Sequence, residues 1–473
     1  MDRRPNIILI QADQHRADTL GINGHPIVET PHLDGLAKEG TNFTHAFCPI
    51  PLCGPSRCSM VTGQWAHNHG ALSNWDCSAL FRPIADEIPT YARALREAGY
   101  HLSYLAKWHV DPDRGPDFFG FHIARAEYAF EEEYLTWRKE EGLPDRPISD
   151  TWFTACDAHF GFTDKGIIPE QSRLGWAAGQ AVKELEACAA QDKPFFFTWQ
   201  PPEPHFPCVV PEPYASMYKP EDIPPWPGFA DPLKNKPYIQ AQMRRTWNAN
   251  GWKWSEWAPS AAHYLGEVSL LDAQIGRVLD AVDRLGLKDN TIVIYTADHG
   301  DMTGSHGMLD KHCVMYDDIV RVPLIIRWPG LEGSGHTSNA FVSHALDLAA
   351  TFCEAGGAKT PDSFDGESLI PVLKGEPGNR EEIFSEYFGY QFGLYLQKMV
   401  RDRQFKYVWN ATAEDELYDL GNDPGEITNL AQNKSFASEL KRLRGRLAHW
   451  MESTNDPCLQ HWTKAQLRDG RSV

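Results

Sequence analysis

The chain has 473 residues, of which 42% are hydrophobic and 23% are charged, and its formal net charge at pH 7 is −19. This length and composition are typical of a soluble globular protein with one large domain and room for a smaller one. The negative charge argues against nucleic acids and anionic membrane surfaces as partners. It also provides no long-range attraction to an anionic ligand, so any anion site must be a local group of positive charges.

The longest apolar runs, such as Asn6–Ala12 and Thr291–Thr296, have the length of strands and are too short to span a membrane. The N-terminus, Met1–Pro5, leads directly into the first of these runs without the apolar region of a signal peptide. We therefore expect the chain as given to be cytoplasmic. Its ten cysteines are spread too thinly for a disulfide scaffold, and most are expected to be buried, reduced thiols.

The first predicted strand, Asn6–Ala12, is a continuous apolar run that ends directly before Asp13 and Gln14. Such runs are typical of strands that are buried on both faces of a parallel sheet. Pro31–Lys38 has a proline at its start and is predicted to be a helix. A short strand, Thr41–Phe47, then leads into a proline-rich loop.

Three further helix–strand pairs follow, and polar residues follow each of their strands. The predicted pairs are Thr90–Ala98 with Tyr100–Ala106, Glu170–Ala190 with Phe195–Trp199, and Ser260–Leu285 with Thr291–Thr296. A strand over Val322–Trp328 and a helix over Ala345–Ala355 come next. Because open α/β sheets bind ligands at the carboxyl ends of their strands, this order predicts a doubly wound, mostly parallel sheet with one functional edge.

From about Pro377 the pattern changes to short runs that are typical of antiparallel strands. These predicted strands are Ile383–Phe388, Leu396–Arg401 and Phe405–Trp409. A final helix carries Phe436, Leu440, Leu443, Leu447 and Met451 on one face. We therefore predict a large α/β domain over residues 1–376 and a small α+β domain, with an antiparallel sheet and a final helix, over residues 377–473.

The proline-rich loop carries the sequence Cys53-Gly-Pro-Ser-Arg57. Proline favours the first position of a helix, which places Cys53 just before a helix N-terminus. Unpaired backbone N–H groups and the helix dipole favour negative charge there, and Arg57 lies one turn further on. The loop is thus either an anion site built around a nucleophile precursor or simply a cysteine in a proline-rich turn.

Two strands end in pairs of possible metal ligands, Asp13 with Gln14 and Asp298 with His299. Hard divalent cations prefer oxygen ligands gathered from several loops. A single aspartate at a strand end more often caps a turn, but two such pairs after apolar strands favour a metal site.

The Cys-x-Pro-Ser-Arg sequence, followed by Thr62-Gly63, resembles the signature of the sulfatases in the alkaline phosphatase superfamily. The resemblance implies that a formylglycine-generating enzyme converts Cys53 to formylglycine, whose hydrate is the nucleophile and contacts the metal. It implies one Ca²⁺ held by Asp13, Gln14, Asp298 and His299. Gln14 stands where the family more often has Asp, as in the related phosphonate monoester hydrolases, so Mn²⁺ and Mg²⁺ remain open.

Lys107-Trp108-His109 resembles the Gly-Lys-Trp-His segment of the sulfatases, with Ala106 in place of the glycine. The resemblance makes Lys107 a sulfate-binding cation and His109 the base that breaks the covalent intermediate. The segment counts against the phosphonate hydrolases.

The same resemblance brings His205 and Lys311 to the transferred sulfuryl group and the leaving oxygen. Arg57 would offset charge on the sulfuryl oxygens, and Asn74 is a candidate substrate contact. The expected reaction is hydrolysis of an organic sulfate ester to an alcohol and inorganic sulfate, through a covalent sulfo-formylglycine intermediate.

The expected substrate is a small sulfated sugar in preference to an aryl sulfate. A phosphonate monoester or phosphate diester hydrolase on the same scaffold stays an alternative, as does a non-catalytic glycan-binding protein. Five tryptophans between Trp226 and Trp257 are candidates either for a pocket wall or for the packing of a long insertion. Nothing in the sequence indicates an oligomeric state.

Overall fold

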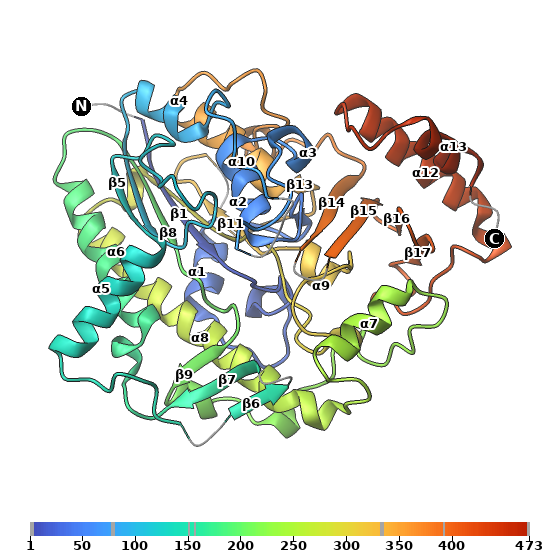
Figure 1. Cartoon of the computed structure of the whole chain (residues 1–473). Coiled ribbons are helices and arrows are strands. Elements are labelled where there is room, and N and C mark those ends of the chain that lie inside the picture. The colour runs from blue at the N-terminus through green and yellow to red at the C-terminus, as the bar shows by residue number, and fades with distance from the viewer. Residues whose placement is uncertain are drawn as a thin grey trace.

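The computed structural model describes residues 4–76, 81–149, 152–155, 158–331, 335–390 and 393–470. Its main sheet has eight strands in the order β12-β2-β11-β10-β1-β8-β4-β5 (Figure 1). The strands are β1 (Asn6–Ala12), β2 (Thr41–Phe43), β4 (His101–Ala106), β5 (Ile123–Ala126), β8 (Phe195–Gln200), β10 (Thr291–Ala297), β11 (Leu324–Arg327) and β12 (His336–Ser338).

Four adjacent parallel strands, β10, β1, β8 and β4, form the centre of this sheet. Every residue of β1 is buried, as its continuous apolar run predicts. Ala12 at the end of β1 pairs with Ala297 at the end of β10, so that the polar residues after both strands meet at one edge. The predicted sheet with a single functional edge is therefore confirmed.

Helices cover both faces of the sheet (Figure 1). One layer contains α1 (Pro31–Glu39), α5 (Glu127–Glu140), α6 (Arg173–Ala189) and α8 (Trp254–Arg284). The other contains α2 (Cys53–Thr62), α4 (Tyr91–Glu97) and α10 (His344–Ala355), with α3 (Ala66–His69) beside α2. Helix α8 begins six residues before its predicted start, because Trp257 is fully buried among aromatic rings and holds the additional turns in place.

The structure corrects one local prediction. Thr41–Phe47 is not one strand: β2 joins the main sheet, whereas β3 (Ala46–Phe47) pairs with β13 (Val342–Ser343) in a separate sheet. Strand β11 runs antiparallel to β10, which makes the main sheet mixed. The sequence analysis also missed α5 and a three-stranded sheet of β6 (Trp152–Ala155), β7 (Ala158–Asp164) and β9 (Cys208–Pro211).

The C-terminal part holds an antiparallel sheet in the order β14-β15-β16-β17. Its strands are β14 (Ile383–Tyr390), β15 (Gly393–Arg401), β16 (Phe405–Asn410) and β17 (Glu416–Asp419), followed by α12 (Ala437–Ser453) and α13 (His461–Asp469). Leu440, Leu443 and Leu447 of α12 are buried against β15 and β16, as the amphipathic pattern predicts. Strand β17 is an addition to the three predicted strands.

The connections contain the short helices α7 (Tyr238–Thr246), α9 (Asp317–Val320) and α11 (Ile370–Leu373). They also contain the 3₁₀ turns Gly21–Asn23 and Ser305–Gly307. Further 3₁₀ turns are Pro169–Gln171, Tyr214–Ser216, Pro220–Asp222, Lys288–Asn290 and Lys434–Phe436. Within the described ranges, no helix combines the length and hydropathy that crossing a bilayer requires. The eight cysteines of those ranges are free thiols, and all but Cys458 are buried.

Candidate active site

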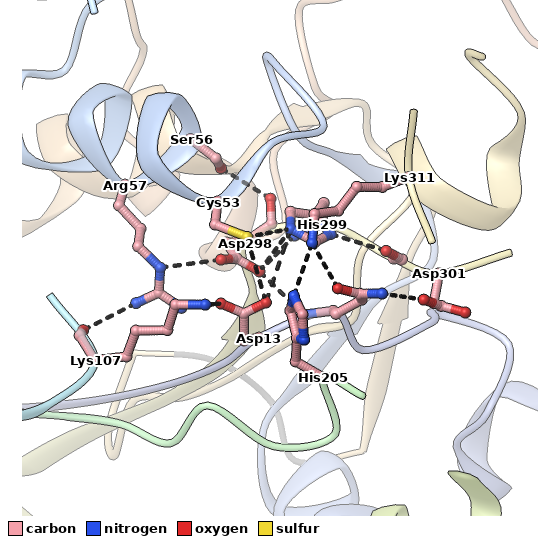
Figure 2. Close-up of polar contacts among 12 residues, drawn as sticks. Asp13, Cys53, Ser56, Arg57, Lys107, His205, Asp298, His299, Asp301 and Lys311 are labelled. Atoms are coloured by element: carbon pink, nitrogen blue, oxygen red, sulfur yellow. Dashed lines mark hydrogen bonds and ion pairs between the residues drawn. The ribbon is translucent and has the colours of Figure 1, made fainter. Parts of the chain in front are cut away.

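Strand ends and one helix N-terminus bring four potential ligands together. Asp13 follows β1, Asp298 and His299 follow β10, and Cys53 is the first residue of α2. One donor atom from each lies within 4.8 Å of the donor atoms of the other three, and all four residues are buried. Figure 2 shows the Cys53 sulfur directed toward His299 and the two carboxylates. The sequence analysis predicted these four residues as ligands together with Gln14, whose side chain is instead hydrogen-bonded to Asp301, Asp310 and Lys311.

Cys53 is held at the start of α2 by its backbone neighbours. Leu52 before it is extended, with φ −153° and ψ 132°, so the helix begins at the cysteine itself. The backbone N–H of Gly54 donates to Asn74 Oδ1 at 2.8 Å. A Cβ at residue 54 would lie 2.9 Å from that oxygen and 3.0 Å from the carbonyl oxygen of His109, so glycine is required by close packing. Asn74 thus fixes the backbone directly after Cys53, and its contact with substrate stays a prediction.

Arg57 binds both carboxylates of the cluster. Its Nη2 lies 3.0 Å from Asp13 Oδ2, and its Nε lies 3.0 Å from Asp298 Oδ2. Its Nη1 donates to Gln200 Oε1 at 2.8 Å. The guanidinium therefore orients the two carboxylates from behind, in addition to adding positive charge to the site.

Two lysines place positive charge beside Cys53. Lys107 Nζ lies 2.6 Å from Asp13 Oδ2, and Lys311 Nζ lies 3.2 Å from Asp310 Oδ1. Burial and the Asp13 carboxylate act to raise the pKa of the Cys53 thiol, but Lys107, Lys311 and His299 together lower it well below the usual thiol value. The site therefore stabilises negative charge at the position of the sulfur.

His205 and Lys311 form a hydrogen-bonded pair with a defined direction. His205 Nδ1 lies 2.7 Å from the carbonyl oxygen of Phe206, which can only accept, so the proton is on Nδ1. His205 Nε2 then accepts from Lys311 Nζ at 2.9 Å. Lys311 also donates to Gln14 Oε1 at 2.7 Å (Figure 2). Two of the predicted site residues are thereby joined to a third.

His109 lies beside the cluster on the loop after β4. Its Nε2 is 3.9 Å from Asp76 Oδ1, and its ring packs edge-on against Trp75 at 5.5 Å between centroids. Burial lowers the pKa of His109, but its polar interactions with Asp76 and Cys53 outweigh this and raise it. The structure thus brings His109 into contact with Cys53, as its expected role requires.

Three residues of the site have left-handed backbone conformations, with φ 63° at Gln14, 77° at Ala106 and 52° at His109. Side chains other than glycine rarely adopt this region, and the strain is typical of functional loops. The left-handed φ of Ala106 explains why a glycine also suits the position directly before Lys107. The backbone turns sharply at the ends of both β1 and β4 to direct side chains into the site.

The donor set fits a hard divalent cation. Two carboxylates and one imidazole converge in a buried space, and burial together with the Asp13 charge raises the pKa of Asp298. Burial lowers the pKa of His299, but Asp298 and the Cys53 thiolate raise it to about 9. Carboxylate oxygens gathered from separate loops are the ligands that hard divalent cations prefer. Gln14 donates its backbone N–H to Asp298 Oδ1 at 3.1 Å, and its side-chain oxygen accepts from Lys311.

Comparison with known proteins agrees with this geometry. The sequence model of the sulfatases matches residues 5–358. The chain belongs to the sulfatase family. A second model, the C-terminal part of N-sulphoglucosamine sulphohydrolase, matches residues 304–453 of this sulfatase.

Two relatives and one solved structure match nearly the whole sulfatase chain. It is 30% identical to an arylsulfatase of Clostridium perfringens, over 96% of this chain and 95% of that one. It is 28% identical to an N-acetylglucosamine-6-O-sulfatase of Bacteroides thetaiotaomicron, over 96% and 88%. The phosphonate monoester hydrolase of Agrobacterium radiobacter has a TM-score of 0.81 and 28% identity, over 96% and 95%. The protein is a sulfuric ester hydrolase with the alkaline phosphatase fold.

The sequence analysis of this sulfatase missed several residues that support the site. Gln200 binds Arg57, and Asp76 lies beside His109. Asp301 and Asp310 both accept from the side-chain amide of Gln14. Gln200 is the last residue of β8 and lies at the same sheet edge as the other site residues. Its position at the end of a predicted strand could have identified it from the sequence. The other three come from loops without a periodic pattern.

The tryptophans of the insertion pack against neighbouring elements. Trp226 lies over the Arg16 guanidinium at 4.2 Å and is buried, and Trp257 is stacked on Phe160. Trp247 packs edge-on against Phe206, the neighbour of His205. Among the described residues, no tryptophan lines the cavity that opens beside Lys107 and His205. Of the two readings of this segment, the structure supports packing of the insertion.

Proposed function

We propose that the protein hydrolyses the sulfate ester of a sugar, using a nucleophile made from Cys53 and a divalent cation held by Asp13, Asp298 and His299. The observation that carries this proposal is the position of Cys53, whose sulfur lies 3.2 Å from His299 Nε2 and 3.7 Å from Asp13 Oδ1. The named activities of two relatives, an arylsulfatase and an N-acetylglucosamine-6-O-sulfatase, support the choice of reaction and substrate class.

Cys53 is the residue that a formylglycine-generating enzyme would modify. A formylglycine hydrate supplies an oxygen nucleophile and a second hydroxyl, and the cation supplies Lewis-acid polarisation of sulfuryl oxygens. The side chain of Cys53 is only 1% exposed in the folded protein. The maturation enzyme would therefore act on the chain before folding closes this site.

The fixed charges of the site suit a sulfuryl group. Lys107 and Lys311 stand on the two sides of the Cys53 position, and the N-terminal backbone of α2 adds the positive end of its dipole. Since these groups are already in place and poorly hydrated, they stabilise charge on the sulfuryl oxygens without reorganisation in the transition state.

Two histidines are positioned for proton transfer. His205 Nε2 receives a hydrogen bond from Lys311 Nζ, so this pair can donate a proton to the leaving sugar oxygen. His109, oriented by Asp76 and in contact with Cys53, can accept a proton from the nucleophilic residue when the covalent intermediate is broken. Such acid–base assistance typically contributes about 10²–10⁴ in rate.

The proposal is tested on protein produced together with a formylglycine-generating enzyme. Mass spectrometry of the peptide that carries Cys53 should show the aldehyde or its hydrate. Activity on 4-nitrophenyl sulfate should disappear in Cys53→Ala and after exhaustive chelation, and return when Ca²⁺, Mn²⁺ or Mg²⁺ is added. Unchanged activity in Cys53→Ala would sink the assignment of the nucleophile.

Hydrolysis of phosphonate monoesters is a second candidate function. Gln14 and the structural likeness to the phosphonate monoester hydrolase of Agrobacterium radiobacter favour it. Phenyl phosphonate and 4-nitrophenyl sulfate esters would be compared on the same enzyme preparation. A higher kcat/KM for the phosphonate would place this activity first, whereas the presence of both Lys107 and His109 favours the sulfate.

A further inference from the structure

A cavity of about 320 Å³ opens beside the catalytic cluster and includes Lys107 and His205 in its wall. Its other walls come from α5, α6, α8 and the ends of β7 and β9. Pockets for drug-sized ligands span about 300–1,000 Å³, so this one is at the small end of that range. It has room for one sugar ring and not for an extended chain.

A second hollow of about 250 Å³ shares Lys107 with this cavity but lacks His205. The group that carries the leaving oxygen must lie next to the pair that protonates it, which is His205 with Lys311. The larger cavity is therefore the one that receives the part of the substrate released as the alcohol.

Three buried side chains in the wall of this cavity have unsatisfied polar atoms. Among the described residues, Glu267 Oε2, Asp164 Oδ2 and Arg138 Nε have no hydrogen-bond partner. Their residues are 2%, 0% and 6% exposed. Because buried polar groups in folded proteins are nearly always paired, these three atoms are open to hydrogen bonds from water or from a ligand in the cavity.

The charges around the cavity disfavour a second anion. Its acidic residues are Glu131, Asp145, Asp164, Glu203 and Glu267. Of the cations, Arg173 is already paired with Glu203 at 2.9 Å and Glu131 at 3.6 Å, and Lys107 with Asp13. The third cation, Arg138, donates to the Tyr134 hydroxyl and to the carbonyl oxygen of Pro144, so five carboxyl groups face three cations around the cavity. Burial and the nearby Glu203 carboxylate raise the pKa of Glu267 to about 8, so that near neutral pH its carboxyl can both donate to and accept from a hydroxyl.

We propose that this cavity binds the sugar ring of a singly sulfated, otherwise uncharged monosaccharide, with Glu267 as a specificity-determining residue that hydrogen-bonds its hydroxyl groups. This rests on the proposed function. It adds that neutral ring substituents are preferred over a second sulfate or a carboxylate.

The test uses the matured, metal-loaded enzyme and two kinds of substrate. One is 4-nitrophenyl sulfate, and the other is the best substrate among the 3-, 4- and 6-sulfates of N-acetylglucosamine and galactose. The variants are Glu267→Leu and Arg138→Lys. The matched control is Asp272→Asn, a buried carboxylate on the same helix that binds the backbone of α1 and does not line the cavity.

We expect Glu267→Leu to lower the ratio of kcat/KM for the sugar sulfate to kcat/KM for the aryl sulfate about 10-fold, mainly through KM, because it removes both the donor and the acceptor of the carboxyl group. Arg138→Lys should lower the same ratio, and Asp272→Asn should leave it unchanged. Because the readout is a ratio within each preparation, partial loss of folded enzyme does not affect it.

A second measurement compares the best sugar sulfate with its analogues that carry a carboxylate or an additional sulfate. The uncharged sugar should have a kcat/KM at least about 10-fold above each of them. Preference for a charged analogue, an unchanged ratio in both cavity variants, or turnover of the aryl sulfate alone would overturn the inference. Failure of the wild type to hydrolyse any sulfate ester would instead count against the proposed function.

Discussion

Lys311 Nζ lies 2.9 Å from His205 Nε2, although 106 residues separate the two in the chain. His205 comes from the loop after β8, and Lys311 from the loop after β10. Burial would lower the pKa of Lys311, but Asp310 and the negative charge at Cys53 raise it, so the lysine remains charged in the site. The pair therefore holds a proton next to the cavity that His205 lines.

Replacing Lys311 by Ala should reduce kcat most for substrates with poor leaving groups. A sugar alkoxide needs a proton as the sulfur–oxygen bond breaks, whereas 4-nitrophenolate leaves without one. We expect a loss of about 10²–10⁴ with a sugar sulfate and a clearly smaller loss with 4-nitrophenyl sulfate. Steady-state kinetics on both substrates measure this, with the exposed Lys288→Ala as control. Equal losses on both would show that Lys311 acts only in binding the sulfuryl group.

Gln14→Asp should tighten Ca²⁺ binding about 10-fold. The variant adds a carboxylate next to Asp13 and Asp298, and affinity for hard cations rises with the number of charged oxygen ligands. Titration calorimetry of the chelator-treated protein measures the Kd. Asn290→Asp is the control, because it adds the same charge at the opposite end of β10. An unchanged Kd in Gln14→Asp would mean that residue 14 does not contact the metal.

Glu267 should make the wild-type protein less stable as the pH rises from about 4.5 to 8. Its pKa is about 8 in the folded state, raised by burial and by Glu203, against about 4.3 for an ordinary glutamate. Over this interval the folded state holds a proton that the unfolded state has lost, so the free energy of unfolding falls, by up to about 1.4 kcal/mol per pH unit. Glu267→Gln should remove this slope.

Urea unfolding at pH 5, 6.5 and 8 measures the effect. The stability of Glu267→Gln relative to the wild type should increase at each step, whereas the exposed Glu354→Gln should follow the wild type. Parallel curves for wild type and Glu267→Gln would contradict the raised pKa of Glu267.

Lys398→Ala should destabilise the protein by about 3–5 kcal/mol. Lys398 is fully buried and lies 2.6 Å from Glu386 Oε2 and 2.7 Å from Asp456 Oδ2, so its removal leaves two buried carboxylates without their cation. Arg446→Ala breaks a half-exposed ion pair with Glu382 and should cost less than about 1 kcal/mol. Denaturant unfolding of both variants makes the comparison. Similar small losses would show that the buried pair contributes little.

Much of the fold follows from short-range patterns. Continuous apolar runs identified β1, β4, β8 and β10, and helical periodicity identified α8 and α12, because burial of one face or both faces of an element is written into its own residues. The same reasoning failed where the decision depended on partners. Thr41–Phe47 divides between two sheets, since the distant strands β12 and β13 determine where each part of it pairs.

For the site, the sequence by itself determined which residues could take part: Asp13, Cys53, Lys107, Asp298 and His299 follow recognisable strand or helix ends. Only the tertiary structure decided what each of them contacts. In the folded chain, Arg57 binds the carboxylates of Asp13 and Asp298. Asn74 accepts a hydrogen bond from the backbone N–H of Gly54. The tertiary structure also assembled the cavity around Glu267, whose neighbours come from separate elements. The physical reason is that propensity and capping act over a few residues, whereas the contacts of a buried charge depend on the packing of the whole chain.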